Sequence, residues 1–314
     1  MEERGKKRGT VVKHTGSHYL VSPVPLWEPT ECVVRGRLRL KGSKTTNPIS
    51  VGDIVEYIPG SESGDKGVII SIEPRKNYII RKSANLSRES HIIASNIDTA
   101  YLVTTIDFPE VKPAFIDRFL VTCEAYRVPV KIVLNKRDLI SGESEDKLEY
   151  FKDIYTKAGY EIIETSVKTG LNIDKIKNEC MNRVSLFSGQ SGVGKSSLIS
   201  AMDPELVLKT ADISDYHLQG KHTTTFYEMH PLSSGGFIID TPGIRGFGLV
   251  EMGKEELSHY FPEMLRLYEE CRFTPCTHTH EPGCRIKEAV ERGEISPERY
   301  FSYIGMLEEE EKYR

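Results

Sequence analysis

The N-terminal quarter of the chain alternates hydrophobic and polar positions over short runs. In residues 31–42, apolar side chains take one set of alternating positions, and Arg35, Arg37 and Arg39 take the other. A period of two is that of a half-buried β-strand, and similar runs continue to residue 82 between clusters of turn-forming residues. About five such strands in this length predict a small β-barrel, for which we expect an oligonucleotide-binding (OB) fold.

From residue 92 onward the pattern changes to longer apolar runs that end in polar residues. Amphipathic helical patterns, such as those at 114–126 and 146–158, lie between these runs. The alternation is typical of an α/β domain, in which helices cover a parallel sheet and ligands bind at the carboxyl ends of the strands. The apolar runs are 99–106, 128–135, 160–166, 183–189 and 235–240.

The chain therefore divides into three predicted domains. We expect an OB-fold domain over residues 1–82, an α/β domain over 83–250 and a helical domain over 251–314. Residues 1–82 hold 15 Lys and Arg against 9 Asp and Glu, so the net charge is +6 there and −10 over the rest of a chain whose total is −4. A basic N-terminal domain suggests a polyanionic partner such as nucleic acid, although an ordinary solvated face would have the same composition.

The distribution of apolar residues also bears on location and assembly. No segment is long and apolar enough to cross a bilayer, and the charged N-terminal segment lacks the apolar core of a secretory signal. We therefore expect a cytoplasmic protein with no membrane partner. Neither a heptad repeat nor a large apolar stripe indicates an oligomer, so we expect a monomer.

Three of the six cysteines, Cys271, Cys276 and Cys284, are close together in the sequence and surround His278. Without a secretory signal, this cluster favours a metal site over a set of disulfides. Three thiolates and one imidazole form the closed tetrahedral set typical of structural zinc, which predicts one zinc ion per chain. His280 is the rival for the imidazole position.

The segment GQSGVGKSS matches the phosphate-binding pattern G-x-x-x-x-G-K-[ST]. It lies between an apolar run and a helical pattern, which is the strand-loop-helix context that the motif requires. Lys195 is expected to bridge the β- and γ-phosphates, and the Ser196 hydroxyl is expected to bind magnesium. The predicted phosphate-loop residues are Gly189, Gln190, Ser191, Gly192, Val193, Gly194, Lys195, Ser196 and Ser197.

Two later segments complete the predicted magnesium and γ-phosphate site. In FIIDTPG, Asp240 ends a buried strand and is expected to hold magnesium through water, while the Gly243 amide is expected to sense the γ-phosphate. In GKHTTT, Thr224 is the threonine expected to close over magnesium. Together with the lysine and serine of the phosphate loop, these residues predict a nucleoside triphosphate site with bound magnesium.

The residue that orients the attacking water is a separate question. Ras-like enzymes carry a glutamine directly after DxxG, whereas this chain has Ile244, which forms no side-chain hydrogen bond. Intrinsic hydrolysis is therefore expected to be slow. His222 is the candidate for holding the water, and the alternative is an ordinary exposed loop histidine. The predicted catalytic residues are thus His222, Thr224 and Lys195.

The predicted base is guanine. In the segment NKRD, a carboxylate such as that of Asp138 accepts hydrogen bonds from both N1–H and the exocyclic amino group of guanine, whereas adenine has no donor at N1. The segment TSVKTG follows the next strand and supplies two residues that would flank the base. The predicted base-binding residues are Asn135, Lys136, Arg137, Asp138, Ser166 and Lys168.

These GTPase motifs occur in an unusual order. Ordinary small GTPases run from the phosphate loop through the switch threonine and DxxG to NKxD and SAK, whereas NKRD and SVK come first in this chain. Joining the original termini and reopening the chain elsewhere gives this order, and domain termini often lie close enough together for that. With the OB-like strands and the segment CRFTPCTHTHEPGC, the permuted order resembles the ribosome small subunit-dependent GTPase A (RsgA) family over nearly the whole chain.

The resemblance implies a circularly permuted GTPase that binds the small ribosomal subunit and its rRNA. It implies a switch or checkpoint in late maturation, with hydrolysis of GTP to GDP and phosphate stimulated by that subunit. It also implies that Cys271, Cys276, His278 and Cys284 hold zinc. Two alternatives remain open: a nucleotide-gated RNA-binding scaffold with incidental hydrolysis, and a P-loop phosphotransferase, against which NKRD and DTPG argue.

Overall fold

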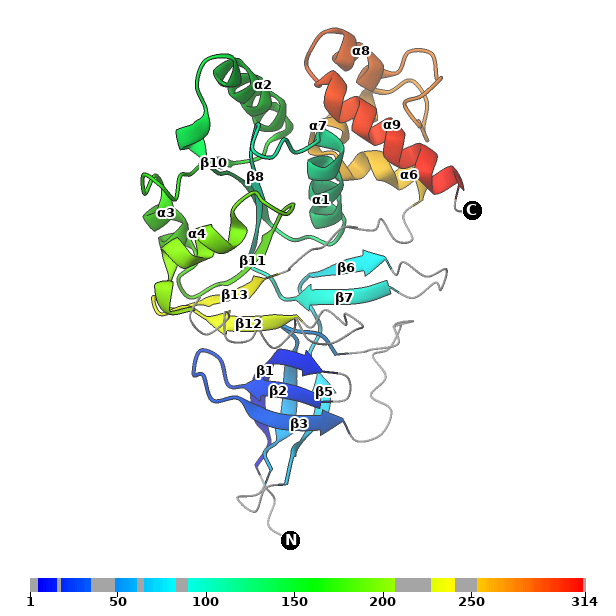
Figure 1. Ribbon diagram of the computed structural model, residues 1–314. Helices are drawn as coiled ribbons and strands as arrows, with labels where there is room; N and C mark the ends of the chain where they lie inside the picture. Colours follow the sequence, from blue (N-terminus) through cyan, green and yellow to red (C-terminus); the bar gives the residue numbers. More distant parts are fainter. Residues whose placement is uncertain are drawn as a thin grey trace.

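Figure 1 shows the computed structural model of the chain, with a barrel at the N-terminal end, a helix-covered sheet in the middle and a group of helices at the C-terminal end. The structure describes residues 5–15, 18–34, 49–60, 65–82, 90–206, 227–240 and 253–312. The predicted α/β class with an N-terminal barrel and a helical C-terminal region is confirmed. The boundaries predicted for the three domains stay predictions.

Five strands close the N-terminal barrel. Their spatial order is β1-β2-β3-β5-β4, and β4 pairs again with β1. β3 and β5 run parallel, while the other neighbours in the barrel run antiparallel. A closed five-stranded barrel with this order is an OB fold, as predicted. The strands are β1 (Lys7–Thr15), β2 (His18–Ser22), β3 (Thr30–Val34), β4 (Ile54–Ile58) and β5 (Gly67–Ile72).

The inward-facing residues of this barrel form a core of their own, which includes Val11, Tyr57 and Ile69, each no more than 2% exposed. The alternation in the sequence thus separates this core from the solvated face, as the period of two predicts. The three arginines at positions 35, 37 and 39 lie outside the described residues. Their place on the polar face of a strand stays a prediction.

The last alternating segment of the N-terminal quarter, residues 66–82, divides between two sheets. Its first part is β5, and its second part, β6 (Tyr78–Lys82), pairs antiparallel with β7 (Ser90–Ser95) in a separate hairpin. A buried carboxylate joins this hairpin to the barrel, because Asp53 accepts bonds of 2.6 Å from Arg75 Nε and Ser95 Oγ. The barrel is therefore fixed against the hairpin by a buried, fully hydrogen-bonded carboxylate.

The central sheet has the spatial order β10-β9-β8-β11-β13-β12. All neighbouring strands are parallel except β12, which runs antiparallel to β13. The predicted helices at 114–126 and 146–158 are present as α1 and α2. The elements are β8 (Thr99–Thr104), α1 (Pro113–Ala125), β9 (Val130–Leu134), α2 (Glu143–Ala158), β10 (Ile162–Glu164), α3 (Ile173–Glu179), β11 (Val184–Ser188), α4 (Lys195–Met202), β12 (Glu228–Pro231) and β13 (Phe237–Asp240).

The central sheet continues into the barrel. Strand β12 pairs antiparallel with β1 at Lys13 and Glu228, whose side chains also form an ion pair with an N–O distance of 2.7 Å. The loop between β2 and β3 adds a second contact, in which the Trp27 ring stacks on Phe237 with 5.8 Å between centroids. The barrel and the central domain are thus joined by backbone pairing as well as by side chains.

The C-terminal region consists of helices and loops packed on α1 (Figure 1). Its apolar core is built from residues such as Phe261 and Met264, and Val121 of α1 belongs to the same core. Among the described residues, no helix has the length and apolar character needed to cross a membrane. The helices of this region are α6 (Lys254–Leu257), α7 (Pro262–Leu265), α8 (Arg285–Glu291) and α9 (Pro297–Lys312), with short 3-10 helices at Ser258–Tyr260 and Tyr268–Glu270. A further 3-10 helix, Arg137–Leu139, lies in the central domain after β9.

Candidate nucleotide and metal sites

The phosphate loop connects the end of β11 to the start of α4, as its sequence predicts. Gly189 has φ +151°, and a Cβ there would lie 2.2 Å from the carbonyl oxygen of Val103. Gly194 has φ +94°, and a Cβ there would lie 2.5 Å from Asn135 Nδ2. Both positions therefore require glycine, since a larger residue would separate the loop from the two strands beside it.

The side chain of Lys195 folds back over the phosphate loop. Its Nζ donates to the carbonyl oxygens of Gly189 at 2.7 Å and Gln190 at 2.9 Å. The ammonium therefore lies above the loop at the N-terminus of α4, where backbone N–H groups and the helix dipole favour an anion. Ser196 and Ser197 are exposed in the first turn of α4, and Ser191 and Gly192 are exposed in the loop, whereas Val193 is buried.

The NKRD segment, residues 135–138, which is predicted to bind guanine, lies against the phosphate loop although about 50 residues separate them in sequence. Buried Asn135 donates from Nδ2 to the carbonyl oxygen of Val193 at 3.0 Å and accepts from Thr165 Oγ1 at 3.1 Å. Lys136 Nζ donates to the carbonyl oxygens of Gly192 and Phe108, each at 2.7 Å. One nucleotide can therefore contact both loops, because Asn135 and Lys136 hold them together.

The carboxylate predicted to read the base, that of Asp138, lies where two loops meet. Ser166 Oγ donates to Asp138 Oδ1 at 2.5 Å, and the Thr169 amide donates to the same hydroxyl at 3.1 Å. Lys168 is exposed in this second loop, as expected of a residue that flanks a base. The structure thus brings the NKRD and SVK segments together at the end of β9 and β10.

Arg137 differs from its neighbours in the NKRD segment. Its Nε donates to Glu164 at 2.9 Å, and its Nη2 donates to Glu145 at 3.0 Å. The guanidinium is therefore held by carboxylates of β10 and α2. Arg137 fixes the NKRD segment to the domain, whereas the adjacent Lys136 reaches the phosphate loop.

The remaining predicted residues of the nucleotide site are only partly described. Asp240 ends β13, and its backbone pairs with Phe187 of β11, so the strand end lies beside the start of the phosphate loop. His222, Thr224 and Gly243 lie outside the described residues. Their roles, and that of the Asp240 side chain, stay predictions.

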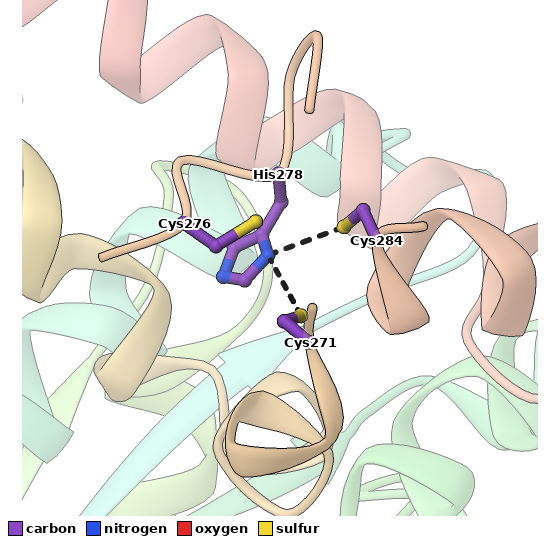
Figure 2. A group of neighbouring side chains, drawn as sticks. All are labelled: Cys271, Cys276, His278 and Cys284. Atoms are coloured by element: carbon purple, nitrogen blue, oxygen red, sulfur yellow. Dashed lines mark hydrogen bonds between the residues drawn. The ribbon is translucent and has the colours of Figure 1, made fainter. Parts of the chain in front are cut away.

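The four predicted metal ligands come together in the C-terminal region. Cys271, Cys276, His278 and Cys284 are all buried, and their ligand atoms lie within 4.8 Å of one another. Figure 2 shows the three sulfur atoms around one edge of the imidazole. The rival, His280, is exposed and its Nδ1 is 2.9 Å from the hydroxyl of Thr279.

The spacing of the ligand atoms fits a tetrahedral ion. Nδ1 of His278 is 3.7 Å from Cys271 Sγ and 3.4 Å from Cys284 Sγ. Zinc–sulfur and zinc–nitrogen bonds of about 2.3 and 2.0 Å at a tetrahedral angle place such atoms roughly 3.5 Å apart. Burial, together with the neighbouring thiols, raises the pKa of Cys276 to about 12. A cation is therefore needed to hold the Cys276 thiol as a thiolate, and the donor set is the one that zinc prefers.

Helix α9 and the side chain of Glu281 hold the loop that carries His278 in place. Tyr300 and Tyr303 donate from their hydroxyls to the carbonyl oxygens of His278 and Thr277, each at 2.7 Å. Glu281 accepts from the Thr277 amide at 2.8 Å and from the Thr279 amide at 3.0 Å. Although burial acts to raise the pKa of Glu281, the hydrogen bonds from Thr277 and from backbone amides lower it to about 2. These supporting residues belong to no motif in the sequence and were not predicted.

A buried ion network joins the C-terminal helices to the central domain. Arg299 of α9 donates from Nη1 to Asp117 of α1 at 2.7 Å and from Nε to Glu263 of α7 at 2.7 Å. All three residues are buried, and the guanidinium also lies 4.6 Å from the centroid of the Phe261 ring. Removing the arginine would leave two carboxylates buried without their cation.

We expect Arg299→Ala to lower the free energy of unfolding by about 3–5 kcal/mol, because breaking a buried ion pair strands the charges of its partners. Urea denaturation followed by circular dichroism measures the change. Arg292→Ala is the control, since it removes an exposed pair in which Arg292 lies 3.7 Å from Glu288. The control is expected to change stability by less than about 1 kcal/mol. Equal losses in the two variants would contradict the role assigned to the buried network.

Comparison with known proteins adds to these geometric findings. A family model described as RsgA GTPase matches residues 72–250. The chain is 49% identical over 309 residues to the small ribosomal subunit biogenesis GTPase RsgA of Phocaeicola vulgatus, covering 98% of this chain and 99% of that protein. It is 50% identical over 312 residues to the protein of the same name in Bacteroides fragilis, with the same coverage.

Two solved structures are similar over nearly the whole chain. The crystal structure of YjeQ from Thermotoga maritima superposes with a TM-score of 0.75 at 35% identity, covering 97% of this chain and 98% of that one. The structure of YloQ, a circularly permuted GTPase, superposes with a TM-score of 0.74 at 27% identity, covering 100% of this chain and 98% of that one. The predicted permutation of the central domain is therefore confirmed.

Proposed function

The chain belongs to the RsgA GTPase family, and on this premise we propose that it binds the small ribosomal subunit and acts as a nucleotide-dependent switch or checkpoint in late maturation of that subunit. The observation that carries the proposal is the joining of the two nucleotide loops. Asn135 and Lys136 bond to the phosphate loop while Asp138 remains beside Ser166. GTP is the nucleotide that this arrangement accepts, and its hydrolysis gives GDP and phosphate.

Each part of the nucleotide has a proposed place. The phosphate loop, Gly189 to Ser197, receives the phosphates, and the residues Asn135 to Asp138 with Ser166 and Lys168 receive guanine. Ser196, Thr224 and Asp240 would hold the magnesium ion that accompanies the triphosphate, and Gly243 would sense the γ-phosphate. Magnesium would supply charge neutralisation between the phosphates, while Lys195 adds a positive charge at the N-terminus of α4.

The second metal is proposed to be one structural zinc ion held by Cys271, Cys276, His278 and Cys284. All four positions of a tetrahedron are then taken by protein atoms, so none remains for a substrate. Support comes from the Nδ1–Sγ distances of 3.4 and 3.7 Å and from the burial of all four residues. The ion would fix the loop to which Tyr300 and Tyr303 of α9 donate hydrogen bonds.

We propose that the protein works as a monomer in the bacterial cytoplasm. The named relatives come from bacteria, and their printed names refer to biogenesis of the small ribosomal subunit. The basic N-terminal domain is the part proposed to face rRNA, since residues 1–82 carry a net charge of +6 on a chain of net charge −4. No partner in a membrane is proposed.

The proposed hydrolysis depends on the small subunit, which is expected to bring His222 to the attacking water. We expect purified small subunits to raise the rate of GTP turnover by about a hundredfold or more, because a water-orienting group of this kind contributes on that scale. His222→Ala should abolish the stimulation while GTP binding and subunit binding stay unchanged. Phosphate release with and without subunits measures the effect, and His280→Ala serves as the control.

Three results would count against this proposal. Phosphate formed only when an acceptor molecule is added would favour a phosphotransferase. Equal binding to the subunit with GDP and with a non-hydrolysable GTP analogue would favour a scaffold, since a switch must distinguish the two states. Full stimulation of the His222→Ala variant would assign the water to another group.

A further inference from the structure

The loop between β8 and α1, residues 105–112, meets both segments of the nucleotide site. The Phe108 carbonyl oxygen accepts from Lys136 Nζ, which also donates to the carbonyl oxygen of Gly192, each at 2.7 Å. The Pro109 ring lies close to Gly192, where an added Cβ would be 3.6 Å from Pro109 Cδ. The β8–α1 loop, the phosphate loop and the NKRD segment therefore meet around one ammonium group.

Lys136 is held in a conformation that it would not adopt by itself. Its φ of +62° and ψ of +36° lie in the left-handed region, which is unfavourable for a residue with a Cβ. The side chain is half-buried and extends toward the phosphate loop, since its Cε would lie 3.8 Å from a Cβ added at Gly194. The two carbonyl acceptors at its tip therefore fix both the stem of this lysine and its strained backbone.

The acceptor supplied by Phe108 is a backbone oxygen, so the shape of the loop decides where it lies. The Phe108 ring is 58% exposed and does not fasten the loop to the core. Buried Thr105 closes the loop instead, because its Oγ1 donates to the Pro109 carbonyl oxygen at 2.6 Å. This bond joins the two ends of the turn that carries the Phe108 carbonyl.

The start of the β8–α1 loop is fastened to the domain by other contacts. Asp107 accepts from Lys147 Nζ at 2.7 Å and also from the hydroxyl of Ser144, both in α2. Ile106 packs in a small apolar core with Leu148 of the same helix. Removing the hydroxyl that closes the loop should therefore loosen its tip without detaching the loop from the domain.

We propose that Thr105 is a positioning residue of the nucleotide site, which holds the Phe108 carbonyl against Lys136 and so fixes the lysine side chain predicted to contact guanine. The inference rests on the proposed binding of guanine nucleotides. A side chain that is held in its binding geometry before the ligand arrives loses less conformational entropy on binding, so the effect falls on affinity. Because Thr105 acts through the Lys136 ammonium, its hydroxyl matters only while that ammonium is present.

The test measures binding of a fluorescent methylanthraniloyl derivative of GDP to the full chain. Thr105→Val keeps the buried position filled and removes the hydroxyl. We expect it to weaken binding about fivefold to tenfold, which is the scale of one lost hydrogen bond. Thr105→Ser keeps a hydroxyl at this position and is expected to bind within about twofold of the unaltered chain.

A second background separates positioning from packing. Lys136→Met keeps an unbranched stem and removes the ammonium, so adding Thr105→Val to it should weaken binding by less than about twofold more. Thr122→Val is the matched control, because buried Thr122 Oγ1 donates to the Arg118 carbonyl oxygen at 2.7 Å within α1. It removes the same kind of bond and is expected to leave the affinity for GDP unchanged.

The possible failures are distinguishable. If the unaltered chain binds no guanine nucleotide, the proposed function fails and this inference fails with it. If the unaltered chain binds GDP and Thr105→Val binds it equally well, only the inference fails. Equal losses in Thr105→Val and Thr105→Ser, or a full loss from Thr105→Val in the Lys136→Met background, would assign the effect to packing. A similar loss in Thr122→Val would assign it to general destabilisation of the domain.

Discussion

Asp138→Asn is expected to shift nucleotide preference from GTP to xanthosine triphosphate. Guanine presents an amino group to this side chain, whereas xanthine presents a carbonyl that an amide N–H can bind. A site built for one hydrogen-bonding edge rejects a mismatched edge strongly, so GTP affinity should fall about a hundredfold or more while affinity for the xanthine nucleotide rises. Titration with fluorescent derivatives of both nucleotides measures the reversal.

The matched control for this change is Asp146→Asn, which makes the same substitution at an exposed position in the first turn of α2. It is expected to leave both affinities as they are. If Asp138→Asn likewise keeps its GTP affinity and gains none for the xanthine nucleotide, the NKRD segment does not read the base. The phosphate loop, with Lys195 bonded to its carbonyls, would then bind the phosphates without selecting the base.

Removing the proposed zinc ion is expected to unfold the C-terminal region while the barrel stays folded. The ligands lie in the apolar core of that region, and structural zinc in small domains contributes on the order of 10 kcal/mol. The His278→Ala variant should lack the bound zinc ion that the unaltered protein carries. Metal analysis measures this loss, and hydrogen exchange over residues 253–312 measures the unfolding.

His280→Ala provides the comparison, since His280 is exposed and lies outside the ligand cluster. It is expected to retain zinc and the protection of its amides. If His278→Ala retains zinc and His280→Ala loses it, then His280 is the zinc ligand and His278 is not. Normal exchange protection after complete removal of zinc by a chelator would show that the region is stable without the ion.

The motifs that could be recognised in the sequence are those whose chemistry is local. A phosphate loop needs its glycines and lysine within nine consecutive residues, and the metal ligands fall within 14, so spacing alone predicts both. The order of the barrel strands could be expected only from the fold class. The period of two that places Tyr78 and Ile80 in a strand is the same in a barrel and in a hairpin, so it could not assign β6 to the second sheet.

Contacts between distant segments escaped prediction. Arg299 lies in a helix that also carries many exposed charges, and only the packing of α1 and α7 against it makes it a buried residue. The bonds from Lys136 to the carbonyls of Gly192 and Phe108 were also invisible, because backbone carbonyls are present at every position. Sequence patterns report which groups are available, whereas tertiary packing decides which of them meet.

The pairing of β12 with β1 has a consequence for solubility. An unpaired strand at the edge of a sheet is a template for aggregation, and natural proteins shorten, charge or cover such edges. Here β12 is a four-residue strand that ends at Pro231, and the barrel covers part of its free side through Lys13 and Glu228. At the opposite edge β10 has only three residues and ends at ion-paired Glu164. A central domain produced without the barrel would uncover the β12 edge and become prone to self-association.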